Sequence, residues 1–316
     1  MTIKRAQGAA LARAALAGNP SDGYGGAVLA VTLPTWAARA EACHASELEV
    51  EPANALVEAT VRRFSRELEP AGLATAVSWS TSIPQRVGLG SSSALVIAVL
   101  RALCGLHRVE LAPAALAELA LAVETEDVGI VAGLQDRVAQ AYEGLTFMEF
   151  GGAARNGRAP DYEQLDPALL PPLLIAWRAE AAGHSGDVHT ILRERHDHGE
   201  PAVREAMGAL AESARGARDA LVERDLARFA QCVDRTYDLR ARLMALDELC
   251  VEMIRVARSC GAGANYTGSG GAIVSVCRDD AHVDQVAGAL GRLGCGVAVL
   301  RSVVAPGPSG VSGQKP

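Results

Sequence analysis

A short run of glycine and serine residues stands directly before a long apolar segment. The run reads Pro84-Gln85-Arg86-Val87-Gly88-Leu89-Gly90-Ser91-Ser92-Ser93-Ala94, and the apolar segment continues to residue 103. Glycine lets a backbone bend tightly and approach a ligand closely. The first N–H groups of a helix attract anions, and serine hydroxyls add hydrogen bonds or a ligand for magnesium. The run therefore predicts a loop that binds nucleotide phosphates, although a plain turn with a helix N-cap has a similar composition.

A second group of side chains that could do chemistry lies between residues 124 and 137. Glu124 and Glu126 end an apolar helical stretch, and a glycine-spaced loop leads from them to Gln135-Asp136-Arg137. A carboxylate beside an arginine is either a plain ion pair or a general base whose charge is held by its neighbour. A separate carboxylate, Glu124 or Glu126, could complete a magnesium site with a serine hydroxyl of the glycine–serine run.

Two further segments combine polar side chains with glycine. Residues 18–26 read Gly-Asn-Pro-Ser-Asp-Gly-Tyr-Gly-Gly, which is strong turn chemistry. This segment is either a surface turn between two strands or a set of polar groups that binds a polyhydroxy ligand. Residues 267–271 read Thr-Gly-Ser-Gly-Gly and precede a predicted buried strand. Their glycines either form a tight turn or let the backbone close over phosphates.

The elements that must position these segments follow from the spacing of apolar residues. Helices are predicted over residues 52–69, 92–105, 113–126, 200–223, 226–246, 248–259 and 282–293. Strands are predicted over residues 27–33, 74–80, 144–150, 173–177, 272–277 and 297–304. Helices and strands alternate without a strict βαβ repeat, so the expected fold class is α+β in layers and not a doubly wound sheet.

Composition limits the possible functions of this 316-residue chain. Its net charge of −7 disfavours a nucleic-acid-binding surface, and its two lysines, Lys4 and Lys315, exclude a phosphate loop that needs an internal lysine. The sequence contains no long apolar run without a charge, so no membrane span is predicted. Arg13 interrupts what would be the apolar part of a signal peptide. The seven cysteines have no CxxC pair, which predicts free thiols in a reducing, cytoplasmic setting.

The motifs, taken in order, resemble those of the GHMP kinases, a family named for galactokinase, homoserine kinase, mevalonate kinase and phosphomevalonate kinase. Residues 84–94 match the family's Pro-x-x-x-Gly-Leu-Gly-Ser-Ser-Ala motif with one serine in place of alanine. Residues 133–136 match its Gly-x-x-Asp motif, and residues 267–271 match its Thr-Gly-x-Gly-Gly motif. The resemblance covers about residues 12–304, and it implies an ATP-dependent kinase with its site between two domains.

The two domains that the resemblance implies are an N-terminal domain like ribosomal protein S5 domain 2 and a ferredoxin-like C-terminal domain. We expect them over residues 1–165 and 166–305, and we expect the residues that follow, 306–316, to be disordered because they are rich in glycine, proline and serine. The N-terminal resemblance to a ribosomal protein raises an RNA-binding module as another class of function, which the acidic charge disfavours.

The resemblance also implies a role for individual residues. Asp136 would accept or orient the proton of the attacking hydroxyl, and Arg13 would lie near the transferred phosphoryl group. Ser92 and Glu124 would hold Mg²⁺, with Glu126 in reserve. The residues expected to line the nucleotide phosphates are Gly88, Leu89, Gly90, Ser91, Ser92, Ser93, Ala94, Gly268, Ser269, Gly270 and Gly271. Those expected to bind the sugar are Asn19, Ser21, Asp22, Tyr24, Gly133, Gln135 and Arg137.

Within the family, residues 18–25, 129–138 and 185–189 are similar to glucuronokinase-like members. Arg137 stands where relatives usually carry glutamine, and this cation either pairs with the carboxylate of a uronic acid or forms an ion pair with Asp136. The expected reaction is phosphorylation of a sugar hydroxyl, with glucuronate as the leading substrate and glucuronate 1-phosphate as the product. The alternatives are a kinase for arabinose, galactose or a heptose phosphate, and a catalytically inactive sugar-binding relative.

The expected partners are ATP, Mg²⁺ and a small sugar or sugar acid. Binding to nucleic acid or to a membrane is not expected. The expected oligomeric state is a monomer or a homodimer. The sequence indicates less about the adenine site. Trp36 and Trp79 could each flank a base, although a place in the core is the favoured alternative for both.

Overall fold

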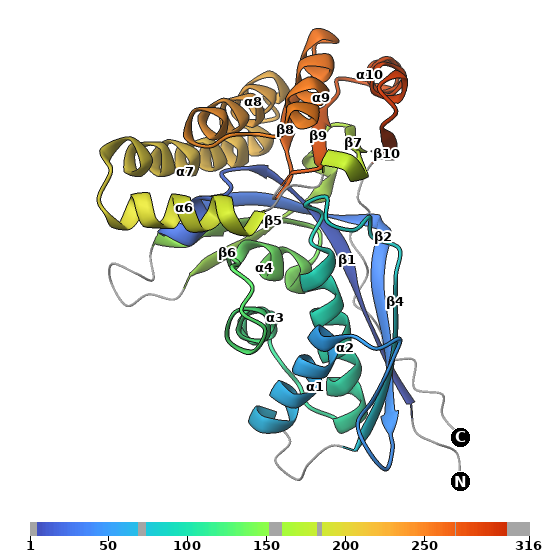
Figure 1. Ribbon diagram of the computed structural model, residues 1–316. Helices are drawn as coiled ribbons and strands as arrows, with labels where there is room; N and C mark the ends of the chain where they lie inside the picture. Colours follow the sequence, from blue (N-terminus) through green and yellow to red (C-terminus); the bar gives the residue numbers. More distant parts are fainter. Residues whose placement is uncertain (1–4, 69–73, 152–159, 182–184, 269, 302–316) are drawn as a thin grey trace.

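The computed structural model describes residues 5–68, 74–151, 160–181, 185–268 and 270–301, and its strands form two sheets (Figure 1). The first sheet contains β1 (Arg5–Ala17), β2 (Ala27–His44), β3 (Glu49–Glu51), β4 (Thr75–Thr81), β5 (Leu145–Glu149) and β6 (Asp161–Leu165). The second contains β7 (Leu173–Trp177), β8 (Gly263–Tyr266), β9 (Ala272–Val276) and β10 (Gly296–Leu300), in the order β10-β7-β9-β8. The predicted tail, 306–316, lies outside the described residues.

Strand β2 is the centre of the first sheet because it is long enough to have three partners. One edge of β2 pairs with β1, and the other edge pairs first with β5, opposite residues 27–31, and then with β4, opposite residues 38–44. Every described pairing except that of β3 with β4 is antiparallel. The mixed helices and antiparallel sheets confirm the predicted α+β class.

The helices lie on both sheets. They are α1 (Ala55–Leu68), α2 (Ser91–His107), α3 (Pro113–Ala122), α4 (Gln135–Tyr142), α6 (Ser185–Asp197), α7 (Pro201–Val222), α8 (Leu226–Leu243), α9 (Glu248–Ser259) and α10 (Asp280–Arg292). In Figure 1, α2 and α4 lie below the strands of the first sheet and α7 lies above them, while α8, α9 and α10 belong to the part of the molecule that holds the second sheet. None of the described helices combines the length and apolar character that crossing a membrane requires.

Strand β1 was not predicted, because seven of its 13 residues are alanine, which favours a helix in isolation. The reason for the strand is its contact with α2. A Cβ atom added to Gly8 would lie 2.1 Å from the carbonyl oxygen of Ala98 and 2.5 Å from the nitrogen of Ala102. The helix therefore packs directly on the backbone of β1, and only small side chains fit between them.

Most other predicted elements are confirmed, with different ends. The strand predicted over residues 27–33 is only the first part of β2, and the helix predicted over 113–126 is α3 followed by one π-helical turn, Val123–Asp127. Elements that the sequence did not predict include β3, β6, β8, α4 and α6. All seven cysteines are free thiols, as their irregular spacing predicted.

The strands change sheets between Leu165 and Leu173, close to the predicted domain boundary after residue 165. Helix α7 then packs back onto β1 and β2, so that Ala214 and Ala217 join the hydrophobic core of the first sheet. The two parts of the chain thus share a packed interface, and the boundary itself stays a prediction.

Candidate active site

The glycine–serine loop before α2 has a backbone that requires glycine. Gly88 and Gly90 have φ angles of 75° and 71°, in the left-handed region that other residues rarely adopt. A Cβ atom on Gly90 would lie 2.9 Å from Nε2 of Gln140. That amide donates to the carbonyl oxygens of Gly90, at 2.8 Å, and Leu11, at 2.9 Å. The loop is therefore fixed against β1 and α4 before any ligand binds.

The second glycine loop, between β8 and β9, lies directly against the first. A Cβ atom on Gly268 would lie 2.6 Å from the carbonyl oxygen of Gly88, and one on Gly271 would lie 2.8 Å from Cα of Val87. Both glycines have positive φ angles, 45° and 90°. Two motifs about 180 residues apart in the sequence are thus in backbone contact, as the resemblance implied. Ser269 of this loop lies outside the described residues.

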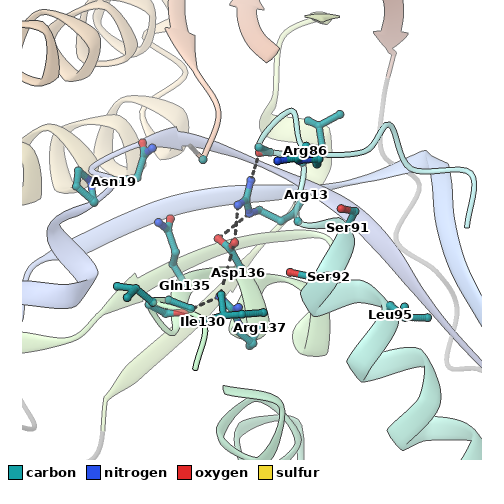
Figure 2. A pocket seen from close by; sticks show the side chains of 18 of the residues that line it. Arg13, Asn19, Arg86, Ser91, Ser92, Leu95, Ile130, Gln135, Asp136 and Arg137 are labelled. Carbon is teal, nitrogen blue, oxygen red and sulfur yellow. Dashed lines mark hydrogen bonds and ion pairs between the residues drawn. The ribbon is translucent and has the colours of Figure 1, made fainter. Parts of the chain in front are cut away.

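Arg13 and Asp136 form a two-point ion pair in the middle of the site (Figure 2). The Nε and Nη2 atoms of Arg13 donate to the two oxygens of Asp136 at 2.7 and 2.5 Å, and Nη1 donates to the carbonyl oxygen of Gly88 at 2.6 Å. The side chain of Arg13 is 3% exposed and that of Asp136 is 18% exposed. The arginine from β1 therefore fixes the carboxylate and the phosphate loop at the same time.

Glu124 lies in the π-helical turn after α3 and is fully buried. It accepts a hydrogen bond from the Ser92 hydroxyl at 2.7 Å through one oxygen and pairs with Arg137 through the other. Glu126, the reserve candidate for the metal, pairs instead with Arg63, and its side chain is 66% exposed. A hydroxyl and a carboxylate oxygen are hard ligands of the kind that Mg²⁺ prefers, so the Ser92–Glu124 pair fits a magnesium site.

The structure gives Arg137 a partner that was not expected, Glu124, in addition to the ion pair with Asp136 that was one of the two expectations. Its guanidinium contacts Glu124 through Nε and Nη2, with the Nε contact at 2.7 Å, and donates to the carbonyl oxygen of Gly133 at 2.8 Å. Its ion pair with Asp136 is longer, with Nη1 3.7 Å from the nearest carboxylate oxygen. With its side chain 4% exposed, Arg137 primarily neutralises Glu124, and its guanidinium is not free to pair with a substrate.

Asp22 lies at the opposite end of the site from the phosphate loop. Burial, with a further contribution from the nearby charge of Asp136, raises the pKa of Asp22 to about 6. A Cβ atom on Gly133 would lie 2.2 Å from Oδ2 of Asp22, so a side chain there would displace the carboxylate. The Nδ2 atom of Asn19 and the Oε1 atom of Gln135 are buried without a hydrogen-bond partner among the described residues. This end therefore offers polar groups with unused hydrogen-bonding capacity to a hydroxyl-rich ligand.

Most of these groups line one cavity of about 620 Å³, although Glu124 is not among the wall residues that the structure describes. In Figure 2, Asn19 and Gln135 lie on one side of Asp136, and Ser91 and Ser92 lie on the other. Of the residues expected to bind nucleotide or sugar, those in the cavity wall are Asn19, Asp22, Tyr24, Gly88, Leu89, Gly90, Ser91, Ser92, Gly133, Gln135, Arg137 and Gly268.

Four of the expected residues lie behind the wall. Ser93 and Ala94 are buried in α2, and Gly271 packs on Val87. Ser21 is fully buried and donates to the carbonyl oxygen of Ala27 at 2.9 Å, which stabilises the turn that presents Asp22. Gly270 is likewise absent from the wall residues that the structure describes.

Three arginines that the sequence did not single out also shape the site. Arg240 of α8 is buried and donates to the carbonyl oxygens of Tyr266 and Gly268, both at 2.7 Å, which holds the second glycine loop. Arg63 of α1 binds three carboxylates around the π-helical turn. Arg193 of α6 lines the cavity beside Tyr24. Each acts on a segment far away in the sequence, so no local motif marks it.

The cavity wall also contains Asn54, Leu56, Trp79 and Thr81. Trp79 donates from Nε1 to the carbonyl oxygen of Pro52 at 2.8 Å. Trp36, the other tryptophan considered for a base, packs edge-on against Trp177 with ring centroids 5.0 Å apart and does not line the cavity. Of the two, only Trp79 is in a position to contact a ligand.

Comparison with known proteins gives matches over both parts of the chain. Residues 55–144 match the model of the GHMP kinases N-terminal domain, and residues 217–294 match that of the GHMP kinases C-terminal domain. The chain is 36% identical over 211 residues to Glucuronokinase 1 of Arabidopsis thaliana, covering 64% of this chain and 57% of that protein. It is 29% identical over 206 residues to D-glycero-alpha-D-manno-heptose 7-phosphate kinase of Campylobacter jejuni, covering 61% and 57%.

Among solved structures, the Streptococcus pneumoniae phosphomevalonate kinase in complex with phosphomevalonate and AMPPNP has the same fold. Its TM-score is 0.76 at 17% sequence identity, covering 95% of this chain and all of that one. The matches to the two curated relatives span just over half of each relative's length. The two family models together match more than half of this chain, in the order in which its motifs occur. The chain therefore belongs to the GHMP kinase family.

Proposed function

We propose that the protein is an ATP-dependent sugar kinase that phosphorylates the anomeric hydroxyl of glucuronate. The observation that carries the proposal is the Arg13–Asp136 ion pair, which lies between a cradle for phosphates and a pocket for hydroxyls. Phosphoryl transfer needs little covalent chemistry from a protein, and it depends on positioning and on neutralising charge. The similarity to Glucuronokinase 1 of Arabidopsis thaliana supports glucuronate as the substrate.

In this mechanism Asp136 accepts the proton of the sugar hydroxyl, and two hydrogen bonds from Arg13 keep its carboxylate from rotating. The guanidinium of Arg13 places a fixed positive charge beside the reacting groups. Asn19, Asp22 and Gln135 bind and orient the sugar, and the backbone N–H groups of the two glycine loops bind the phosphates of ATP.

Ser92 and Glu124 are the residues that would hold Mg²⁺. When bound, the ion neutralises charge on the phosphates. Arg137 balances the charge of Glu124 and fixes its orientation, since it pairs with the carboxylate oxygen that does not contact Ser92. Trp79 and Asn54, which also line the cavity, would contact the base of the nucleotide.

A second candidate function, a kinase for a heptose phosphate, is favoured by the match to the Campylobacter jejuni enzyme. Both candidates require an anionic sugar, and they differ in whether the anion is a carboxylate or a phosphate. They are distinguished by substrate preference alone.

The test is release of ADP from ATP and Mg²⁺ with glucuronate, galacturonate, glucose, galactose, arabinose and heptose 7-phosphate in turn. We expect selective turnover of glucuronate, and a loss of about 10²-fold or more in Asp136→Asn with ATP binding retained. Asp284→Asn, which changes an exposed aspartate of α10, is the matched control and should behave like the wild type. Preference for heptose 7-phosphate would favour the second candidate, and full activity of Asp136→Asn would contradict the role of Asp136.

A further inference from the structure

The cavity wall contains four arginines, Arg13, Arg86, Arg137 and Arg193. Two of them are neutralised by carboxylates of the protein, since Arg13 pairs with Asp136 and Arg137 pairs with Glu124. Within the part of the chain that the structure describes, Arg86 and Arg193 form no ion pair and no side-chain hydrogen bond. These two are therefore the cations of the cavity with charge available for a ligand.

The two free cations belong to different ends of the cavity. Arg86 is in the loop that leads into Gly88, on the phosphate side. Arg193 projects from α6 beside the turn that carries Asp22, where its Cζ atom lies 4.8 Å from the centre of the Tyr24 ring. A Cβ atom on Gly23 would lie 3.2 Å from Nη2 of Arg193.

Arg193 is held in a defined place although its side chain is exposed. Its guanidinium lies over the ring of Tyr24, and a cation is attracted to the face of an aromatic ring. The same ring contacts His196, one turn further along α6, with centroids 4.5 Å apart. The absence of a side chain on Gly23 leaves the approach to the guanidinium open.

We propose that Arg193 binds the carboxylate of the sugar acid and so selects anionic over neutral sugars. This inference rests on the proposed function, because it assigns the end of the cavity beside Asp22 to the sugar. A guanidinium presents two parallel N–H donors to a carboxylate, a geometry that a neutral hydroxymethyl group cannot satisfy. Arg137, the cation first considered for this role, is already engaged by Glu124.

The test compares steady-state kinetics of the wild type, Arg193→Gln and Arg86→Gln, with Arg292→Gln of α10 as an exposed arginine control. For Arg193→Gln we expect the KM for glucuronate to rise about 10- to 100-fold with the KM for ATP unchanged, since a charge-assisted contact is lost. Arg86→Gln should raise the KM for ATP and leave that for glucuronate unchanged. Arg193→Lys should recover part of the loss.

The inference would be overturned if the KM of Arg193→Gln for glucuronate were within twofold of the wild-type value. It would also be overturned if Arg86→Gln, and not Arg193→Gln, raised the KM for glucuronate. Calorimetric titration of glucuronate into each variant separates this result from failure of the proposed function. Suppose that the wild type binds glucuronate but does not turn it over, and that Arg193→Gln does not bind it. The inference then stands and the kinase assignment fails. If the wild type does not bind glucuronate, the inference fails.

Discussion

Asp136 and Asp22 are two carboxylates of one cavity with different partners. The charge of Asp136 is balanced by Arg13, which donates two hydrogen bonds to the carboxylate. Asp22 instead accepts hydrogen bonds from backbone N–H groups, the one from Gln135 at 3.4 Å. The difference suits different tasks. A carboxylate that is paired with a cation keeps its position when it accepts a proton. A carboxylate without a cation is stabilised most by a ligand that donates hydrogen bonds to it.

The raised pKa of Asp22 makes this residue a cost to stability at neutral pH. Its pKa is about 6 in the folded protein and 3.8 in the reference state, so the native state holds the proton more tightly. The stability that Asp22 contributes therefore falls as the pH rises from about 4 to 6, and the full penalty is present above pH 6. A shift of this size corresponds to about 3 kcal/mol.

We expect Asp22→Asn to unfold at a higher urea concentration than the wild type at pH 8, and the difference to shrink toward pH 5. The same variant should bind the sugar more weakly because an acceptor is lost. Asp284→Asn controls for the loss of one carboxylate. A stability difference that does not change with pH would contradict the assigned pKa.

At the residue scale, the sequence predicted those side chains that belong to local motifs. Arg13, Ser92, Glu124 and Asp136 were identified, and the structure brings them together. The partner of Arg137 could not be predicted, because the fold brings Glu124 from 13 residues away onto its guanidinium. Arg193 was missed for the same physical reason, since helix α6 reaches the cavity only through tertiary packing.

At the scale of elements, the π-helical turn Val123–Asp127 places Glu124 in the interior and Glu126 and Asp127 at the surface. Arg63 holds the surface side of this turn, with N–O distances of 2.6 Å to both outer carboxylates. The turn is therefore fixed from one side by Arg63 and from the other by Arg137. A shift of the turn would move the carboxylate assigned to Mg²⁺.

We expect Arg63→Gln to lower the free energy of unfolding by about 2 kcal/mol, because the ion pairs between this buried cation and its partly exposed carboxylate partners are lost. It should also raise the Mg²⁺ concentration needed for half-maximal activity. The matched control is Arg62→Gln, whose side chain is 69% exposed and 3.7 Å from Glu58, and which should change stability by less than about 0.5 kcal/mol. An unchanged Mg²⁺ requirement in Arg63→Gln would show that the turn does not depend on this contact.

Arg240 has the corresponding role for the second glycine loop. It lies 3.3 Å from the centre of the Tyr266 ring and donates to the backbone on both sides of Thr267. We expect Arg240→Gln to raise the KM for ATP about tenfold while kcat changes less, since the loop loses the contact that holds Gly268. Arg242→Gln, an exposed position on the same helix, is the control. Lower stability with an unchanged KM for ATP would limit Arg240 to a structural role.

Elements with a clear apolar period, such as α7 and α9, could be predicted from the sequence, and elements defined by packing could not. Strand β1 is rich in alanine and carries glycine where α2 lies on its backbone, and no periodicity marks such a strand. Strand β6 has mostly exposed residues. Its pairing with β5 decides its conformation.

At the scale of the whole molecule, the candidate site depends on the contact between the two parts of the chain. Helix α7 packs on β1 and β2, and the loop after β8 packs on the loop before α2. The family resemblance implied that these loops meet. The path of α6 across the sugar end was not predicted, and it is this path that brings Arg193 to the cavity.

The reaction proposed for this cavity is transfer of a phosphoryl group from ATP to a sugar acid. The most direct measurement is a phosphorus NMR time course of the protein with ATP, Mg²⁺ and glucuronate, with Asp136→Asn run in parallel. We expect a new phosphate resonance coupled to the anomeric proton, growing as ADP appears, and growing at least ~10²-fold more slowly in Asp136→Asn. Free phosphate in place of that resonance, or equal rates in the two proteins, would contradict the proposed reaction.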